Sequence, residues 1–146
     1  LVISTLVTPT VNRKVRQEAT ARNILINAMD DVPNCNFIAP SIVRRGDLTV
    51  AISTSGKAPA LAVRLRQRLE QMLGPEYARF LELAGPLRDD LAERYPDFDT
   101  RKTLWYELVD SDILDLLKQG NEVKAQQRIT DIINAQPEAV TEGADA

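Results

Sequence analysis

The chain has 146 residues, of which 44% are apolar, 27% charged and 5% aromatic, a composition that suits folded domains and excludes collagen, low-complexity disorder and a disulfide scaffold. The chain has one cysteine and no histidine, which excludes Ser-His-Asp and Cys-His catalysis and the usual zinc sites, so we expect no metal site. No segment resembles a secretion signal or a membrane span, so we expect a cytoplasmic protein. The net charge of −3 is the sum of a basic half and an acidic half. Residues 1–74 carry ten Lys and Arg and five Asp and Glu, whereas residues 75–146 carry eight Lys and Arg and sixteen Asp and Glu. The first half is therefore suited to bind anions.

The first residues predict a strand, a helix and a second strand. Residues 1–3 form a short apolar run, residues 11–22 have helical periodicity, and residues 24–26 form a continuous apolar run. A continuous run is typical of a parallel strand covered on both faces. We therefore expect residues 1–36 to be an α/β segment, and a chain that opens on a strand is expected to be a truncated domain.

Residues 37–74 predict short strands followed by a helix. Apolar residues at 37–39, 42–43 and 48–52 surround a turn at Arg45-Gly46-Asp47, which indicates two or three strands. Arg44 and Arg45 could pair with carboxylates, or could equally lie in a solvated hairpin. A helix should begin at Pro59 and end at Gly74.

The remainder predicts only helices. We expect them over residues 75–91, 100–109, 112–117 and 122–134, with Val123 and Ile129 facing inward, and a flexible tail over residues 137–146. Trp105 and Tyr106 are more typical of a core than of a ligand site. Cys35, alone between two asparagines, is expected to be inert.

The segment Ser53-Thr54-Ser55-Gly56-Lys57 connects a predicted strand to a predicted helix start. Backbone N–H groups, hydroxyls and the lysine would together favour a bound anion. The glycine spacing excludes a Walker A loop. The alternative is an ordinary serine-rich capping turn.

Asp30 and Asp31 directly follow a predicted strand, and Asn27 lies three residues before Asp30. In α/β proteins, ligand groups gather at the carboxyl ends of strands, and a carboxylate there can accept a proton. The alternative is that one or both aspartates only cap a turn before Pro33.

Two stretches resemble one family. Asn27-Ala28-Met29-Asp30-Asp31, and then residues 37–62 with Ala51-Ile52-Ser53-Thr54-Ser55-Gly56-Lys57-Ala58-Pro59, are similar to precorrin-2 dehydrogenase, the N-terminal module of siroheme synthase. The resemblance is close over residues 1–74 and looser beyond. The glycine-rich loop with which the family binds NAD does not occur in this chain, so the residues that would contact the cofactor are unknown.

The resemblance implies NAD-dependent oxidation of precorrin-2 to sirohydrochlorin, with ferrous iron insertion in some members. Asp30 matches the aspartate implicated in catalysis, and Thr54 matches a residue that lines the substrate pocket together with Asn27, Ser53, Ser55, Gly56 and Lys57. The implied organisation is a remnant of a Rossmann-type NAD-binding unit (1–36), a dimerisation and substrate-pocket region (37–74), a helical C-terminal subdomain (75–136) and a tail. The implied partners are a second copy and the tetrapyrrole.

Two other functions remain open from the residues alone. The chain could be a non-catalytic tetrapyrrole-binding or dimerisation fragment, because the glycine loop is missing. It could also bind nucleic acid through its basic half. The cationic helices, however, carry no interleaved aromatics for stacking bases, which argues against nucleic acid.

Overall fold

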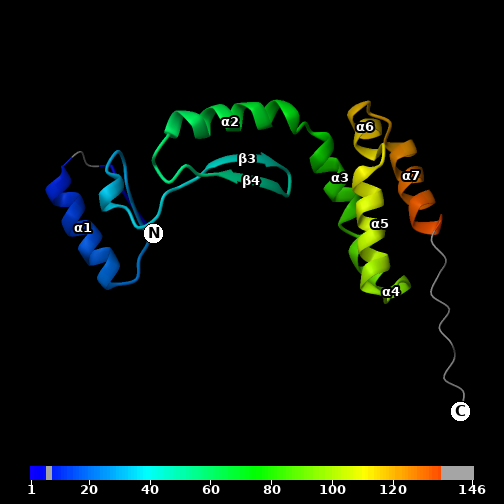
Figure 1. The fold of residues 1–146 in the computed structure, drawn as a ribbon, viewed down its shortest axis with the longest axis horizontal. Coiled ribbons are helices and arrows are strands. Elements are labelled where there is room, and N and C mark those ends of the chain that lie inside the picture. Colours follow the sequence, from blue (N-terminus) through cyan, green and yellow to red (C-terminus); the bar gives the residue numbers. More distant parts are fainter. Residues whose placement is uncertain (6–7, 136–146) are drawn as a thin grey trace, which may run out of the picture. The chain divides into compact units, whose positions relative to one another are not determined.

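A computed structural model describes residues 1–5 and 8–135. The chain divides into two compact units (Figure 1). Unit 1 comprises Leu1–Val43 and Val50–Glu70, and unit 2 comprises Arg44–Thr49 and Gln71–Ala146. Within the described residues, no helix is long and apolar enough to cross a membrane.

Unit 1 begins with a parallel βαβ arrangement. Strand β1 (Val2–Ser4), helix α1 (Pro9–Ala21) and strand β2 (Ile26–Ala28) follow in order, and β1 pairs with β2 in parallel register, Ser4 opposite Ala28. Pro9 occupies the first turn of α1, where its missing N–H costs nothing. The predicted order of strand, helix and parallel strand is confirmed, and α1 begins at Pro9 instead of residue 11.

The second strand begins two residues later than expected. Asn23 has a left-handed φ of +54°, and the Ile24 N–H donates to the Ala19 carbonyl at 2.8 Å, so both residues still belong to the end of α1. Leu25 is consequently 51% exposed instead of buried between two layers. The prediction of a strand over residues 24–26 was wrong in its bounds because the turn that closes the helix was not recognised.

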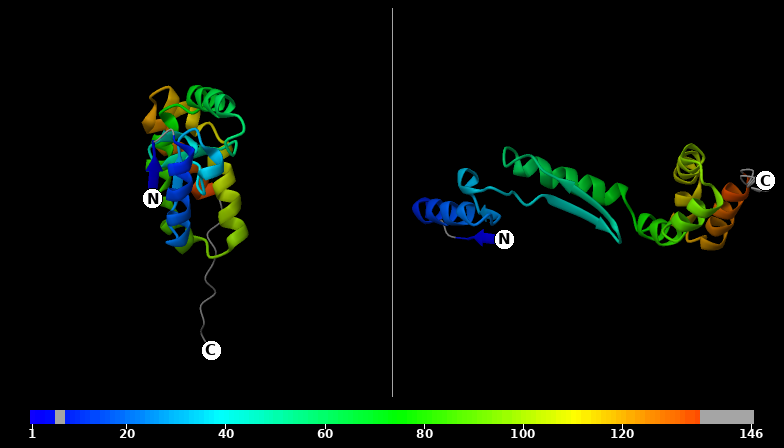
Figure 2. Two further views of the ribbon diagram at one scale, coloured as in Figure 1. Left: turned by 90° about the vertical axis from the view of Figure 1, so that its left-hand side faces the viewer. Right: turned by 90° about the horizontal axis from the view of Figure 1, so that it is seen from below.

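After a short 3₁₀ turn, η1 (Val32–Asn34), the chain forms a hairpin and a helix. Strands β3 (Ser41–Arg45) and β4 (Leu48–Ile52) are joined by the predicted turn at Gly46, and helix α2 (Pro59–Met72) follows (Figure 2). Residues 37–39 are not a strand, because Asn36 and Phe37 instead donate their backbone N–H groups to the Ile26 carbonyl.

Unit 2 is helical. Its elements are α3 (Glu76–Ala84), α4 (Leu87–Arg94), α5 (Phe98–Asp110), α6 (Ile113–Lys118) and α7 (Glu122–Ala135). The single helix expected over residues 75–91 is wrong, since α3 ends at Ala84 and α4 begins at Leu87. Pro86 has no N–H to continue the hydrogen-bond ladder, and its ring excludes the carbonyl one turn before it. Gly85 and Pro86 therefore separate two helices.

The helices of unit 2 enclose the main core of the described chain. Eleven of the sixteen buried apolar residues belong to this cluster, among them Leu91, Leu104, Leu108 and Ile113. Val123, expected inside, is 78% exposed at the start of α7, whereas Ile129 is buried as predicted.

Candidate functional site

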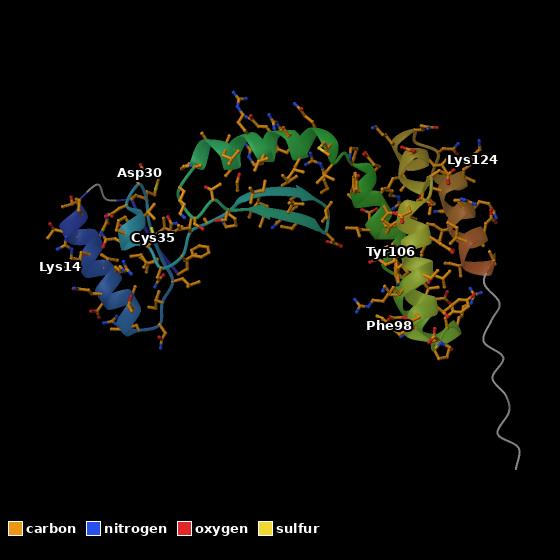
Figure 3. All side chains as sticks on the ribbon, viewed as in Figure 1. Lys14, Asp30, Cys35, Phe98, Tyr106 and Lys124 are labelled. Carbon is orange, nitrogen blue, oxygen red and sulfur yellow. The ribbon has the colours of Figure 1, made fainter. Side chains whose placement is uncertain are left out.

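Asp30 lies just beyond the end of β2, in unit 1 (Figure 3). The strand ends in a turn in which the Met29 N–H donates to the Ser4 carbonyl (2.9 Å) and the Asp31 N–H donates to the Ala28 carbonyl (3.2 Å). Asp30 has a φ of +57°, which is uncommon for a residue other than glycine. Its side chain is exposed and forms no hydrogen bond or ion pair with any described residue. The turn thus holds a carboxylate whose oxygens remain available.

The neighbouring carboxylate, Asp31, is tied into the fold through one of its oxygens. Its Oδ2 accepts from the Asn12 amide at 3.0 Å and from the Asn34 amide at 2.8 Å. Asn12 is 1% exposed on α1, and its Oδ1 accepts from the buried Ser4 hydroxyl at 2.6 Å. The hydrogen bonds from Asn34 and Asn12 lower the pKa of Asp31 below its ordinary value. Two adjacent aspartates therefore have different environments, one structural and one open.

Sequence reasoning did not single out this polar network. Ser4, Asn12 and Asn34 lie on three different elements, and nothing local in the sequence links them to Asp31. The signal that could have indicated this network is a polar residue on the inner face of a predicted helix, because a buried amide needs a hydrogen-bond partner.

Asn27 and Cys35 hold the chain around β2. The Asn27 amide donates to the Phe37 carbonyl at 3.1 Å. The Cys35 sulfur accepts from the Ala28 N–H at 3.1 Å and donates to the Ala28 carbonyl at 3.3 Å. The amide of Asn27 is thereby occupied in the fold, and its Oδ1 is the atom left to meet a ligand.

The predicted anion-binding loop is a tight, hydroxyl-lined turn before α2. The Ser53 hydroxyl accepts from the Ser55 N–H (3.2 Å), and the Thr54 hydroxyl accepts from the Ala58 N–H (3.2 Å). Each hydroxyl still has its own proton to donate outward. Lys57 is exposed and has no ion-pair partner among the described residues.

The loop packs against the segment that follows Asp30. Gly56 has a φ of +74°, and a Cβ placed on it would lie 2.8 Å from Cγ2 of Val32 and 3.5 Å from Cδ1 of Ile38. Val32 is two residues after Asp30, so unit 1 brings together two segments that lie more than 20 residues apart in sequence. Only a residue without a side chain allows this approach.

The side chain of Arg45 in the hairpin binds backbone carbonyls. The Arg45 Nε donates to the Leu73 carbonyl at the end of α2 (2.6 Å), and its Nη1 donates to the Arg44 carbonyl (2.9 Å). Arg45 belongs to unit 2, and its contacts there tie the hairpin to the chain that leads into α3.

Unit 2 contains an open groove that sequence reasoning did not anticipate. It has a volume of about 970 Å³ and lies between α3, α4 and α5, with Asp47 of the hairpin turn in its lining. Trp105, expected in the core, packs against the core with part of its ring and lines the groove with the rest. Tyr106 is 60% exposed, so the expectation of a core position was wrong for this residue.

Three family models match successive parts of the chain. Residues 1–41 match a putative NAD(P)-binding region, residues 45–72 match the central region of sirohaem biosynthesis proteins, and residues 76–133 match the sirohaem synthase dimerisation region. Together they account for nearly all the described residues.

Individual relatives agree with these matches. The chain is 38% identical to the siroheme synthase of Pseudoalteromonas translucida over 88% of its own length and 27% of that protein, and 38% identical to that of Photobacterium profundum over 84% and 26%. Among solved structures it is similar to SirC, a precorrin-2 dehydrogenase, with a TM-score of 0.56, 25% identity, and 90% of this chain and 62% of that chain covered. This likeness confirms the predicted mixed α/β fold. The chain spans about a quarter of the length of these curated relatives.

Proposed function

Because this chain belongs to the siroheme synthase family, we propose that it forms part of an enzyme that oxidises precorrin-2 to sirohydrochlorin with NAD⁺. The observation that carries the proposal is the open carboxylate of Asp30 at the end of a parallel strand, near a hydroxyl-lined loop. A location in the cytoplasm stays a prediction.

Asp30 supplies the base. The oxidation removes a hydride and a proton from precorrin-2, and when NAD⁺ is bound its nicotinamide accepts the hydride. Because this chain contains no histidine, the proton acceptor that we assign within it is a carboxylate at the end of β2. Asp30 has both oxygens available, whereas Oδ2 of Asp31 is occupied by two amides.

The loop of Ser53, Thr54, Ser55, Gly56 and Lys57 binds carboxylates of the substrate. Precorrin-2 carries many carboxylates, and the loop offers two hydroxyl donors and the ammonium of Lys57, which has no ion-pair partner among the described residues. Asn27 contributes its remaining Oδ1 as an acceptor. The position of Gly56 against Val32 supports a shared site with Asp30.

The residues present do not by themselves suit the pyrophosphate of NAD. The chain provides β1, α1 and β2, but residues 5–8 between β1 and α1 are Thr, Leu, Val and Thr, without the glycines that let a backbone approach phosphate. No contact to the cofactor is assigned to this chain. Ferrous iron, which some family members insert, would enter as a substrate; the described residues contain no group of three or more potential metal ligands.

The test is turnover by Asp30→Asn beside Asp31→Asn, in the enzyme that carries the complete NAD-binding unit. Asparagine tolerates the left-handed backbone of Asp30, so this change removes the base and keeps the turn. Turnover should fall by about 10²–10⁴, the usual contribution of a positioned acid or base. The affinity for the tetrapyrrole should change far less.

Asp31→Asn is the matched control, since it removes the same charge one residue away. Near-normal turnover in Asp30→Asn would overturn the catalytic role. An equal loss in both variants of checked fold would mean that the turn, and not the Asp30 carboxylate, is required.

We also propose a homodimer with residues 37–74 at its interface. Along β3 and α2, Ile42, Leu61 and Val63 are 44%, 51% and 43% exposed, and contact with a second copy would cover such apolar side chains. The match of residues 76–133 to a dimerisation region supports the dimer itself.

Sedimentation at micromolar concentration should give twice the chain mass of 16.3 kDa. Leu61→Glu should yield monomers, whereas Val123→Glu, an equally large charge insertion at a more exposed residue of α7, should not. If Val123→Glu dissociates the dimer and Leu61→Glu does not, the interface lies in residues 76–133 instead.

A further inference from the structure

Asn12 is a buried polar side chain to which the proposed function gives no role. It lies on α1, which packs against β2 and η1 (Figure 1), and it is 1% exposed. Burying an amide is costly unless its hydrogen bonds are made within the fold. The partners of Asn12 therefore indicate what its burial provides.

The amide of Asn12 connects the end of β1 to the turn after β2. Its Oδ1 accepts from the Ser4 hydroxyl at 2.6 Å, and its Nδ2 donates to Oδ2 of Asp31 at 3.0 Å. An ionised carboxylate can only accept hydrogen bonds, so only one orientation of the amide satisfies both contacts. The hydrogen bonds therefore run in one direction, from Ser4 through Asn12 to Asp31.

The residues on both sides of Asp30 are tied to other elements. On one side, the Met29 N–H donates to the Ser4 carbonyl of β1 at 2.9 Å. On the other side, Asp31 accepts from Asn12 of α1. Ser4 takes part in both ties, because its carbonyl binds Met29 and its hydroxyl binds Asn12. The turn is thus held at two points by elements outside it.

Asp30 makes no contact that would hold its own carboxylate in place. Its side chain is exposed and forms no hydrogen bond with a described residue. Its φ of +57° is a left-handed conformation, which residues other than glycine keep only where the surrounding structure imposes it. The direction of the Asp30 carboxylate therefore depends on how the backbone of residues 29–31 is held.

Two other contacts in this region differ from that of Asn12. Asn34 also donates to Oδ2 of Asp31, at 2.8 Å, but it belongs to the segment that follows the turn and does not connect it to another element. Arg16 of α1 donates to the Pro33 carbonyl, two residues beyond Asp31, through an exposed side chain. Asn12 is thus the buried contact by which α1 reaches the residue next to Asp30.

We propose that Asn12 is a positioning residue for Asp30, because its amide holds Asp31 and thereby the left-handed turn that directs the Asp30 carboxylate toward the substrate. The inference rests on the proposed function, in which Asp30 is the base. A displacement of about 1 Å in a reacting group can lower a rate about 100-fold. A residue that only holds the turn can therefore affect turnover.

The test is the steady-state kinetics of Asn12→Leu in the enzyme that carries the complete NAD-binding unit. Leucine has nearly the same size and removes both hydrogen bonds, so α1 no longer holds Asp31. We expect kcat to fall by about 10- to 100-fold. The KM for precorrin-2 should stay within about twofold, because the loop at Ser53–Lys57 is unchanged.

Gln17→Leu is the matched control. It makes the same exchange of an amide for an apolar side chain on α1, at an exposed position. Its kcat should stay within about twofold of the unaltered enzyme, as surface changes usually do little. Circular dichroism and thermal unfolding check that each variant is folded at the assay temperature.

The second measurement repeats Asn12→Leu in the Asp30→Asn background. If Asn12 acts through Asp30, the residual turnover should fall by less than about twofold further, since no base is left to position. A residue that only stabilises the fold, or that serves the cofactor, would lower turnover by the same factor in both backgrounds. Such equal losses would overturn the proposal.

Ser4→Ala provides the same test if Asn12→Leu does not fold. It removes one hydroxyl from the same series of hydrogen bonds and should lower kcat by about 3- to 10-fold, again only where Asp30 is present. An unchanged kcat in the folded variant would overturn the role of Asn12 and leave that of Asp30 intact. Near-normal turnover in Asp30→Asn alone would instead overturn the proposed function, and this inference with it.

Discussion

The carboxylate of Asp31 should make the stability of unit 1 depend on pH. Its pKa is lowered on folding by the Asn34 and Asn12 amides. A carboxyl whose pKa is lowered stabilises the fold above its unfolded pKa of about 3.9, and this contribution is lost as pH falls through the lower, folded value. Asp31→Asn should therefore unfold at a lower temperature than the unaltered chain at pH 7, with the difference shrinking below about pH 4.

Thermal unfolding followed between pH 7 and 2.5 checks this prediction. Asp30→Asn is the control, since Asp30 forms no such hydrogen bonds with the described residues. The difference in unfolding temperature between Asp30→Asn and the unaltered chain should not shrink below about pH 4. A constant gap for Asp31→Asn over the whole range would contradict the assignment.

Lys57 should contribute charge to the anion-binding loop. Lys57→Glu should weaken tetrapyrrole binding and flatten its salt dependence, because one attractive charge near the ligand is lost. Lys118→Glu, on α6 in the acidic half, should change neither quantity. Isothermal titration of the tetrapyrrole at two salt concentrations measures both quantities. Equal losses of affinity in Lys57→Glu and Lys118→Glu would mean that the loop is an ordinary helix cap and not an anion-binding site.

Gly56→Ala should destabilise the chain more than Gly120→Ala. Both glycines have a φ of +74°, but a Cβ at Gly56 would meet Val32 at 2.8 Å, whereas a Cβ at Gly120 has nothing within 4 Å. The left-handed backbone conformation alone should cost alanine about 1–2 kcal/mol at either site, and the collision adds to this cost at Gly56. Urea denaturation measures the difference, and equal costs would contradict the close packing of the loop.

At the scale of elements, Tyr95 joins the end of α4 to α7. Its ring is 1% exposed, and its hydroxyl donates to the Ile133 carbonyl at 2.8 Å. Tyr95→Phe should lower the free energy of unfolding by about 1–3 kcal/mol, because a buried carbonyl loses its donor. Tyr106→Phe, at a 60% exposed position, should have little effect, and a similar loss in both would contradict the role of the hydroxyl.

The helix start at Pro59 was predictable, because proline is favoured in the first turn of a helix. Pro9 also begins a helix, but apolar periodicity placed that start at residue 11. The break at Gly85-Pro86 was missed because the apolar spacing of Leu83, Leu87 and Leu91 continues across it. Periodicity reports which side of the chain is buried, and it does not report where the backbone turns.

The candidate site was predictable in its residue types and not in its assembly. The motifs around Asp30 and Gly56 each consist of residues that are adjacent in the chain, so they can be recognised from the sequence. The contact between Gly56 and Val32 and the bond between Asn12 and Asp31 join distant residues and depend on how the elements pack. The roles of Asn27, Ser53, Thr54, Ser55 and Lys57 stay predictions.

At the scale of the whole molecule, the two units should differ in protection against hydrogen exchange. Unit 2 holds the cluster of eleven buried apolar residues, whereas the other five buried apolar residues of the described chain lie in unit 1. Amides of Leu104 and Leu108 should therefore exchange more slowly than those of Ile26 and Ala28, since opening exposes more apolar surface. Exchange read by NMR checks this order, and greater protection in β2 would contradict it.

The β1–β2 pair has one covered edge and one open edge, and the open edge affects how the chain behaves in concentrated solution. The outer side of β2 is occupied, because Ile26 and Ala28 bond to Asn36, Phe37 and Cys35. The outer edge of β1 has no such partner among the described residues, and its Ile3 is 62% exposed. An open apolar edge recruits further strands, so stored samples should become turbid as they are concentrated.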